Sequence, residues 1–104
     1  MGDSVRLSIV VPMFSSQRSI VELVARINST LSNNKFGRYE IILVNDGSPD
    51  DVVSVVREEL MGPELVLVDL MRNYGQINAT LAGLEISAGE IVVTMDDDLQ
   101  FPPE

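Results

Sequence analysis

Three consecutive aspartates, Asp96, Asp97 and Asp98, carry the clearest chemical signal in this chain. Two carboxylates about 5 Å apart repel each other by roughly 3 kcal/mol at an effective dielectric constant near 20. No lysine or arginine occurs in residues 88–104 to offset this charge. In an extended segment Asp96 and Asp98 point to the same side, where a hard divalent cation, Mg²⁺ or Mn²⁺, would relieve the repulsion. The alternative is an acidic turn exposed to water.

Two further segments have residue types suited to binding a nucleotide. Asp46, within the sequence Asn-Asp-Gly-Ser, can accept hydrogen bonds from a nucleobase imide or a ribose hydroxyl. Gly75 precedes a segment with helical periodicity, so the backbone there could approach a phosphate at the start of a helix. Ordinary turn chemistry explains both segments as well. The glycine spacing matches neither the dinucleotide fingerprint nor the phosphate-binding loop of nucleotide hydrolases.

The elements that must position these residues are strands and helices in alternation. Three segments with helical periodicity separate four short apolar runs, at residues 7–11, 39–44, 65–70 and 91–95. Runs with almost no polar residue indicate strands buried on both faces, and therefore a parallel sheet with helices on each side. Right-handed crossovers favour a Rossmann-like α/β sheet with the strands in the order 3-2-1-4.

The helix boundaries follow from capping signals. The first helix is expected over residues 20–31, where apolar residues share one face and Ser19 begins a capping box. Ser48 is expected to cap the second helix, because a proline follows it at the first helical position. The third helix is expected to run from about residue 76 to residue 88, with Gly89 as its C-terminal cap.

This topology brings the polar segments together. Because all four strands run the same way, the residues that follow each strand lie along one edge of the sheet. Ligands of such sheets bind at this edge, beside the point where the strand order reverses, here between the first and fourth strands. The segments that meet there are residues 12–16, 45–48, 72–75 and 96–100.

Composition excludes several classes of function. The 104 residues suffice for one domain, and 16 acidic against 7 basic residues give a net charge of −9. Nucleic acids and anionic membranes require clustered basic residues, so neither is an expected partner. With no cysteine and no histidine, the chain lacks disulfides, thiolate metal sites and histidine-based catalysis. No uncharged stretch is long enough to span a membrane, and we expect a cytoplasmic protein.

Several ordered segments resemble family 2 glycosyltransferases, which have the GT-A fold. They lie at residues 9–14 (Ile-Val-Val-Pro-Met-Phe), 42–50 (Ile-Leu-Val-Asn-Asp-Gly-Ser-Pro-Asp) and 95–104 (Met-Asp-Asp-Asp-Leu-Gln-Phe-Pro-Pro-Glu). The stretch Arg-Asn-Tyr-Gly-Gln at residues 72–76 resembles the branch that transfers sugars to polyprenyl phosphates, including dolichol phosphate. The resemblance covers nearly the whole chain.

The resemblance implies binding of a UDP- or GDP-linked sugar. The family's DxD motif matches Asp96 and Asp98, which serve the metal and the donor diphosphate, and Gln100 matches a further position of the metal site. Asp46 matches the acid that contacts the base. Residues 14–16 are Phe-Ser-Ser where the family usually has Tyr-Asn-Glu. Together with the predicted topology, this gives the nucleotide-binding residues as Pro12, Phe14, Ser16, Asp46, Arg72, Gly75, Asp96 and Asp97.

The chain ends at Glu104, directly after the DxD motif, where family members continue into an acceptor-binding half. We therefore expect residues 1–104 to be the N-terminal, donor-binding half of an inverting, metal-dependent glycosyltransferase. The catalytic base and any membrane-associated segment would lie in the other half, and this chain alone would be inactive. Two alternatives are a noncatalytic module that binds nucleotide or self-associates, and a Mg²⁺-dependent phosphoryl-transfer domain.

Overall fold

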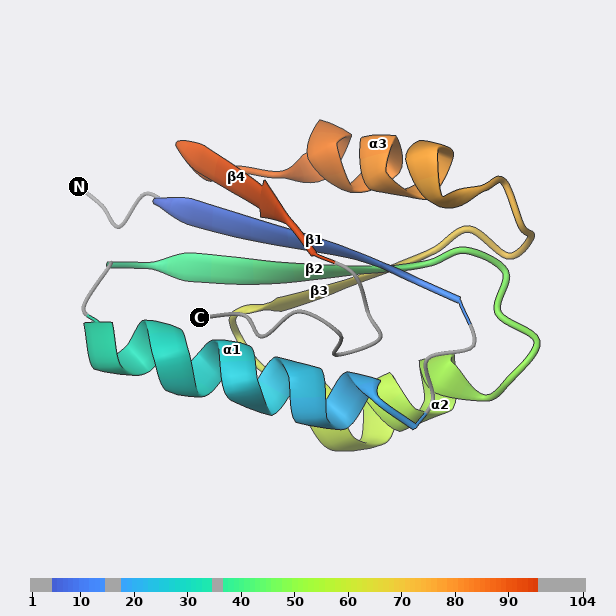
Figure 1. The fold of residues 1–104 in the computed structure, drawn as a ribbon, viewed down its shortest axis with the longest axis horizontal. Helices are drawn as coiled ribbons and strands as arrows, with labels where there is room; N and C mark the ends of the chain where they lie inside the picture. The colour runs from blue at the N-terminus through green and yellow to red at the C-terminus, as the bar shows by residue number, and fades with distance from the viewer. Residues whose placement is uncertain (1–4, 15–17, 35–36, 96–104) are drawn as a thin grey trace.

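The computed structural model describes residues 5–14, 18–34 and 37–95. Within these residues strands and helices alternate as predicted (Figure 1): β1 (Leu7–Met13), α1 (Ile20–Asn34), β2 (Tyr39–Asn45), α2 (Val52–Val55) continuing into the π-helical turn η1 (Val56–Leu60), β3 (Leu65–Asp69), α3 (Gln76–Ile86) and β4 (Ile91–Thr94). Every strand pairing is parallel, and the order β3-β2-β1-β4 confirms the predicted topology.

Two separate cores cover the two faces of the sheet. Successive strand residues point to opposite faces, so Ile9 and Val11 of β1 pack on the side of α1, whereas Val10 packs on the side of α3. Figure 1 shows α1 and α2 together on one side of the sheet and α3 on the other. A Cβ at Gly83 of α3 would lie 2.4 Å from Cγ1 of Val10, so the glycine allows α3 to approach the sheet closely.

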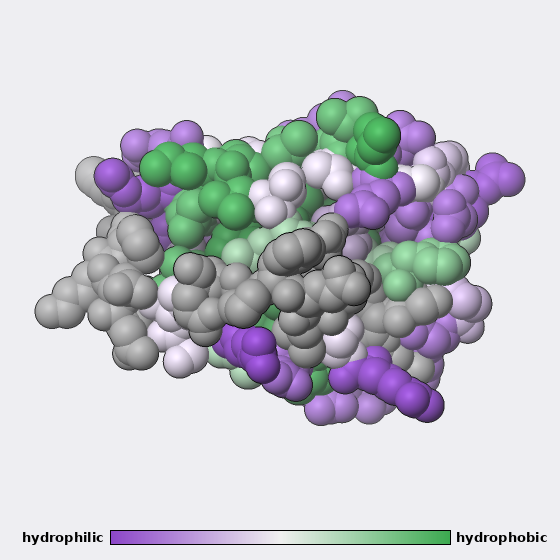
Figure 2. Space-filling view, in the orientation of Figure 1, coloured by the Kyte–Doolittle hydropathy of each residue, from purple (hydrophilic) through white to green (hydrophobic). Residues whose placement is uncertain are grey.

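The strands differ in burial according to their place in the sheet. The central strands β1 and β2 are buried over most of their length, which confirms the expectation for these two. For β4 the expectation of burial on both faces is wrong, because all four of its residues are exposed and β1 is its one partner among the described strands. Figure 2 shows the resulting apolar surface over β4 and α3, which includes Ile77, Leu81, Ile91 and Val93.

The predicted cap of the second helix is wrong. The N-cap residue is Asp51, not Ser48, and its side chain makes no capping hydrogen bond. The Ser48 N–H instead donates to Oδ1 of Asn45 at 3.1 Å, and the Ser48 hydroxyl bonds to the Asp50 carboxylate. Ser48 therefore closes the turn after β2, and the helix begins only at Val52.

The predicted end of the third helix is also wrong. Helix α3 ends at Ile86, with Ser87 in the C-cap position. The N–H of Ala88 donates to Oε2 of Glu40 at 2.7 Å, and the N–H of Gly89 donates to Oγ of Ser8 at 2.8 Å. These hydrogen bonds to the sheet replace the helical ones, so Gly89 belongs to the connection into β4 and does not cap the helix.

Candidate functional site

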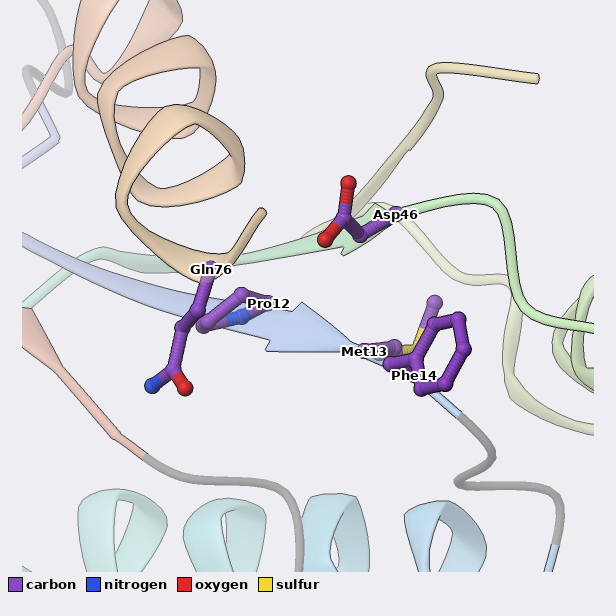
Figure 3. Close-up of a pocket in the computed structure, with 5 residues that line it drawn as sticks. All are labelled: Pro12, Met13, Phe14, Asp46 and Gln76. Atoms are coloured by element: carbon purple, nitrogen blue, oxygen red, sulfur yellow. The ribbon is translucent and has the colours of Figure 1, made fainter. Parts of the chain in front are cut away.

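A pocket lies at the carboxyl edge of the sheet, where β1, β2 and the start of α3 meet (Figure 3). It is lined by Pro12, Met13, Phe14, Asp46 and Gln76. Its volume is about 170 Å³, which is below the roughly 300–1,000 Å³ of pockets that enclose a whole small ligand. The pocket therefore suits one ring-sized part of a larger ligand, with the rest of that ligand lying along the open edge.

Asp46 is the acidic residue among the described residues that line this pocket, and hydrogen bonds hold it in place. Asp46 is only 4% exposed, and its backbone N–H donates to the carbonyl oxygen of Met13 at 2.9 Å. Oδ1 of its carboxylate accepts the backbone N–H of Tyr74 at 2.8 Å. In Figure 3 the carboxylate projects from the end of β2 toward the start of α3. A carboxylate can accept several hydrogen bonds, so this arrangement leaves acceptor capacity for a ligand.

The segment between β3 and α3 forms the neighbouring wall of the edge. Gly47 has φ +68°, and a Cβ at this residue would lie 2.3 Å from the backbone of Arg72 and Asn73. The turn after β2 and the segment after β3 are thus in direct backbone contact. The Arg72 guanidinium lies over the Tyr74 ring, 5.8 Å from its centroid, which is within the range of a cation–π interaction.

Gly75, directly before α3, has a positive φ angle and leaves open space beside the start of the helix. Its φ of +98° is in the region that favours glycine, and a Cβ there would meet no atom of the described residues within 4 Å. Helix α3 begins at the next residue, Gln76, so its first turn starts beside this open space. The amide groups of a helix N-terminus favour an anionic ligand.

The predicted site residues divide into three groups. Pro12, Phe14 and Asp46 line the pocket. Arg72 and Gly75 lie on the adjoining segment but are not among the lining residues of this pocket. Ser16, Asp96, Asp97, Asp98 and Gln100 lie outside the described residues.

Two lining residues, Met13 and Gln76, were not among those predicted to bind the nucleotide. Gln76 follows Gly75 at the same edge, and this position is the signal that could have identified it. Met13 is fully buried. Nothing in the sequence marks it as a ligand-binding residue, because a methionine at the end of an apolar strand is typical of a hydrophobic core.

The predicted metal ligands have the chemistry that a divalent cation requires. Carboxylate and amide oxygens are hard donors, which fit Mg²⁺ or Mn²⁺. Met95, the last residue that the structure describes, donates its N–H to the carbonyl oxygen of Val10 at 3.0 Å and so lies beside β1. Among the residues for which the structure gives positions, no three histidine, cysteine, aspartate or glutamate side chains cluster in a way that could hold a metal ion.

Comparison with known protein families identifies the family of this chain. The model described as "Glycosyl transferase family 2" matches residues 8–104. The chain belongs to glycosyl transferase family 2. This confirms the resemblance found in the sequence, and the phosphoryl-transfer alternative has no support from this family.

Relatives within the family are sugar transferases that use a polyprenyl phosphate. The undecaprenyl-phosphate 4-deoxy-4-formamido-L-arabinose transferase of Enterobacter sp. (strain 638) is 43% identical over 102 residues, and that of Sodalis glossinidius (strain morsitans) is 44% identical over 101. In both cases the match covers 95% of this chain and 31% of the relative. The chain thus spans about a third of the length of these relatives.

Solved structures of glycosyltransferases have the same fold. The mannosyltransferase PcManGT from Pyrobaculum calidifontis, in complex with GDP-Man and Mn²⁺, matches with a TM-score of 0.76 and 28% identity, covering 89% of this chain and 27% of that one. S. aureus TarS 1-349 in complex with UDP matches with a TM-score of 0.74 and 26% identity over the same shares of the two chains. The Rossmann-like sheet is therefore that of the GT-A fold.

Within the described part of the chain, no helix is both long enough and apolar enough to span a membrane.

Proposed function

We propose that this family 2 chain binds the donor nucleotide of a glycosyltransferase that transfers a sugar from a UDP- or GDP-linked donor to a polyprenyl phosphate. The observation that carries the proposal is the Asp46 carboxylate. It is almost completely buried, it is held in place through Tyr74, and it still lines a pocket at the carboxyl edge of the parallel sheet. A ring-sized pocket with one fixed carboxylate suits the imide or amino edge of a nucleobase.

The ligand's phosphates would extend from this pocket along the open edge. The start of α3 after Gly75 offers backbone amides, and Arg72 on the adjoining segment offers a positive side chain. The net charge of −9 opposes a free diphosphate, so a bound cation would strengthen binding. We assign that role to Mg²⁺ or Mn²⁺ held by Asp96, Asp98 and Gln100. PcManGT, which binds Mn²⁺ together with its donor, supports this assignment by similarity.

The residues of this chain would orient the donor for substitution at the sugar. Asp46 would fix the base, and the start of α3 would hold the diphosphate in line with it. An acceptor oxygen would attack the anomeric carbon, and the bond from this carbon to the diphosphate oxygen would break with inversion. The bound metal ion would stabilise the charge that develops on the departing nucleoside diphosphate. A phosphate acceptor is ionised at neutral pH, so it needs little help from a base.

We place the acceptor site, any catalytic base and any membrane contact of the complete glycosyltransferase in the part of the relatives' length that this chain does not match. The named activity of the relatives, on undecaprenyl phosphate, supports a polyprenyl phosphate acceptor and a location at the cytoplasmic face of a membrane. We propose residues 1–104 as the nucleotide-sugar-binding domain of that protein. The 104-residue chain itself is expected to bind nucleotide without turnover.

Calorimetric titration of the chain with UDP and with GDP, each with and without Mn²⁺, tests the proposal. We expect binding of one nucleotide in the presence of Mn²⁺ and at least tenfold weaker binding without it. Asp46→Asn keeps an acceptor for the Tyr74 N–H but removes the charge, so nucleotide affinity should fall roughly tenfold, since hydrogen bonds to charged groups are the stronger ones. Asp51→Asn, at an exposed position before α2, is the matched control and should leave affinity unchanged.

The metal assignment has its own test in Asp98→Asn. This variant should bind nucleotide without Mn²⁺ as the parent chain does, but it should lose most of the increase that Mn²⁺ gives. Equal Mn²⁺ dependence in the variant and the parent would contradict the assignment. No binding of either nucleotide under any condition would contradict the proposed function as a whole.

The exposed apolar surface of β4 and α3 favours a second candidate function, that of a self-associating module. Exposed apolar strands at a sheet edge promote pairing with another chain. Val92→Lys places a charge in the middle of β4, and it should reduce any dimer seen by analytical ultracentrifugation. A stable dimer without nucleotide binding would favour this candidate over the first.

A further inference from the structure

Asn45 is the last residue of β2 and lies next to the pocket residue Asp46. The residue is 6% exposed, and its side-chain amide makes two hydrogen bonds in different directions. Nδ2 donates to Oδ1 of Asp69 at 3.1 Å, and Oδ1 accepts the N–H of Ser48 at 3.1 Å. One side chain therefore joins the end of β3 to the turn after β2.

Asp69 also accepts a hydrogen bond from the segment that follows β3. The same Oδ1 accepts the backbone N–H of Met71 at 3.0 Å, and the N–H of Leu70 donates to the carbonyl oxygen of Asn45 at 3.0 Å. Met71 has φ +69°, which is uncommon for a residue other than glycine and is held here by these bonds. After this reversal the chain passes Gly47 and reaches Tyr74, whose N–H binds Asp46.

The position of Asn45 requires a group that donates on one side and accepts on the other. Ionised Asp69 can only accept, and the Ser48 N–H can only donate. A carboxylate at residue 45 would accept from Ser48 but would face the Asp69 carboxylate at about the same 3.1 Å, with two negative charges in contact. An asparagine amide satisfies both neighbours.

We propose that Asn45 is a positioning residue for nucleotide binding: its amide holds residues 69–74 so that the Tyr74 N–H fixes the Asp46 carboxylate at the pocket. The effect on nucleotide binding rests on the proposed function, whereas the effect on the segment does not. The proposal predicts that the amide and the carboxylate can be exchanged. In the double variant Asn45→Asp, Asp69→Asn, the new asparagine donates to the new aspartate and its oxygen still accepts from Met71.

Two measurements on the full 104-residue chain test this: UDP and GDP affinity with Mn²⁺, and hydrogen exchange of the Tyr74 amide without nucleotide. Asn45→Asp should weaken nucleotide binding at least tenfold and lower the Tyr74 protection at least tenfold. The double variant should restore both to within about threefold of the parent. Asp69→Asn alone keeps an acceptor for the Asn45 amide, so it should stay within about threefold.

Asn28→Asp is the matched control, because it makes the same charge change on α1 and still accepts the Tyr39 hydroxyl. It should leave both measurements unchanged. If Asn45→Asp fails to fold, recovery of folding in the double variant supports the proposal. Additive effects of the two substitutions, or normal Tyr74 protection in Asn45→Asp, would overturn it. If the parent binds no nucleotide, the proposed function fails, and the exchange measurement still decides whether Asn45 positions the segment.

Discussion

Two hydrogen-bonded clusters lie at opposite ends of the central strands β1 and β2. At the amino end, Ser8 donates its hydroxyl to Oε2 of Glu40 at 2.5 Å, and both side chains accept backbone N–H groups of the connection between α3 and β4. At the carboxyl end, Asn45 donates to Asp69 at the end of β3, and Asp46, directly after β2, accepts the Tyr74 N–H of the segment between β3 and α3. Both clusters therefore use polar side chains at the ends of the central strands to fix a connection of α3.

The two ends differ in the space that remains after these bonds form. At the amino end a Cβ on Gly89 would lie 2.6 Å from the backbone nitrogen of Ser8, so the connection is packed closed. At the carboxyl end a Cβ on Gly75 would lie more than 4 Å from every atom in the described part of the chain, and a pocket adjoins Asp46. The same kind of interaction thus seals one end and holds the other end open.

The largest effect is expected at the contact between the two carboxyl-end segments. Gly47→Ala adds a Cβ about 2.3 Å from the backbone of Arg72, at a residue with φ +68°. Backbone strain and overpacking together should lower the free energy of unfolding by about 4 kcal/mol, measured by urea denaturation. Gly62→Ala is the control, because its Cβ would meet only the flexible Glu64 side chain and its effect should stay below about 1 kcal/mol. Similar losses in both variants would contradict the close contact.

The second largest effect is expected at the amino end, where a substitution should lower stability without changing nucleotide affinity. Ser8→Ala removes the acceptor of the Gly89 N–H at a residue that is 0% exposed, and it should cost about 2 kcal/mol of stability. Nucleotide affinity, measured under conditions in which the variant is folded, should not change. A loss of affinity as large as that of Asp46→Asn would show that the amino end is coupled to the pocket. The two ends would then not differ in function.

The sequence was sufficient for the sheet but not for its connections. Apolar runs predict four parallel strands, and crossover handedness favours the order β3-β2-β1-β4, which the structure confirms. Ser48 and Gly89 were assigned to helix caps because local rules put them there. Gly89 donates to Ser8, 81 residues away in sequence, and only the packed sheet brings these two together. Ser48 instead donates to Asn45, three residues before it, in a local turn that competes with helix capping.

The candidate site shows the same division. Pro12, Phe14 and Asp46 were predicted from their place after strands, and they line the pocket. The role of Asn45 depends on Asp69, 24 residues later, which is its neighbour only through the pairing of β2 with β3. No local pattern contains that information.

A smaller effect on stability is expected from the charge of Glu40 at the amino end. Glu40→Gln keeps the shape of the side chain but removes its charge, so the hydrogen bonds from Ser8 and Ala88 become weaker. We expect a loss of about 1 kcal/mol in the free energy of unfolding, measured by urea denaturation, with no change in nucleotide affinity. Glu58→Gln, on the exposed side of η1, is the control. Equal stability of both variants would mean that the charge of Glu40 contributes nothing.

The smallest effect on stability is expected on the outer surface of the carboxyl end. Arg72→Ala removes the exposed contact with the Tyr74 ring and should cost about 0.5 kcal/mol in unfolding experiments. Its effect on nucleotide affinity should be larger than this, because the proposal gives Arg72 a place near the phosphates. An affinity equal to that of the parent chain would remove Arg72 from the proposed site.

The open space at Gly75 separates two reasons for a glycine, lack of room and backbone conformation. The Cβ of an L residue would meet no atom of the described residues within 4 Å, so the φ of +98° alone disfavours Gly75→Ala. This backbone strain should cost roughly 1–3 kcal/mol in the free energy of unfolding. The added methyl group would also stand beside the start of α3, where the proposal places the diphosphate, so the variant should bind its donor less well.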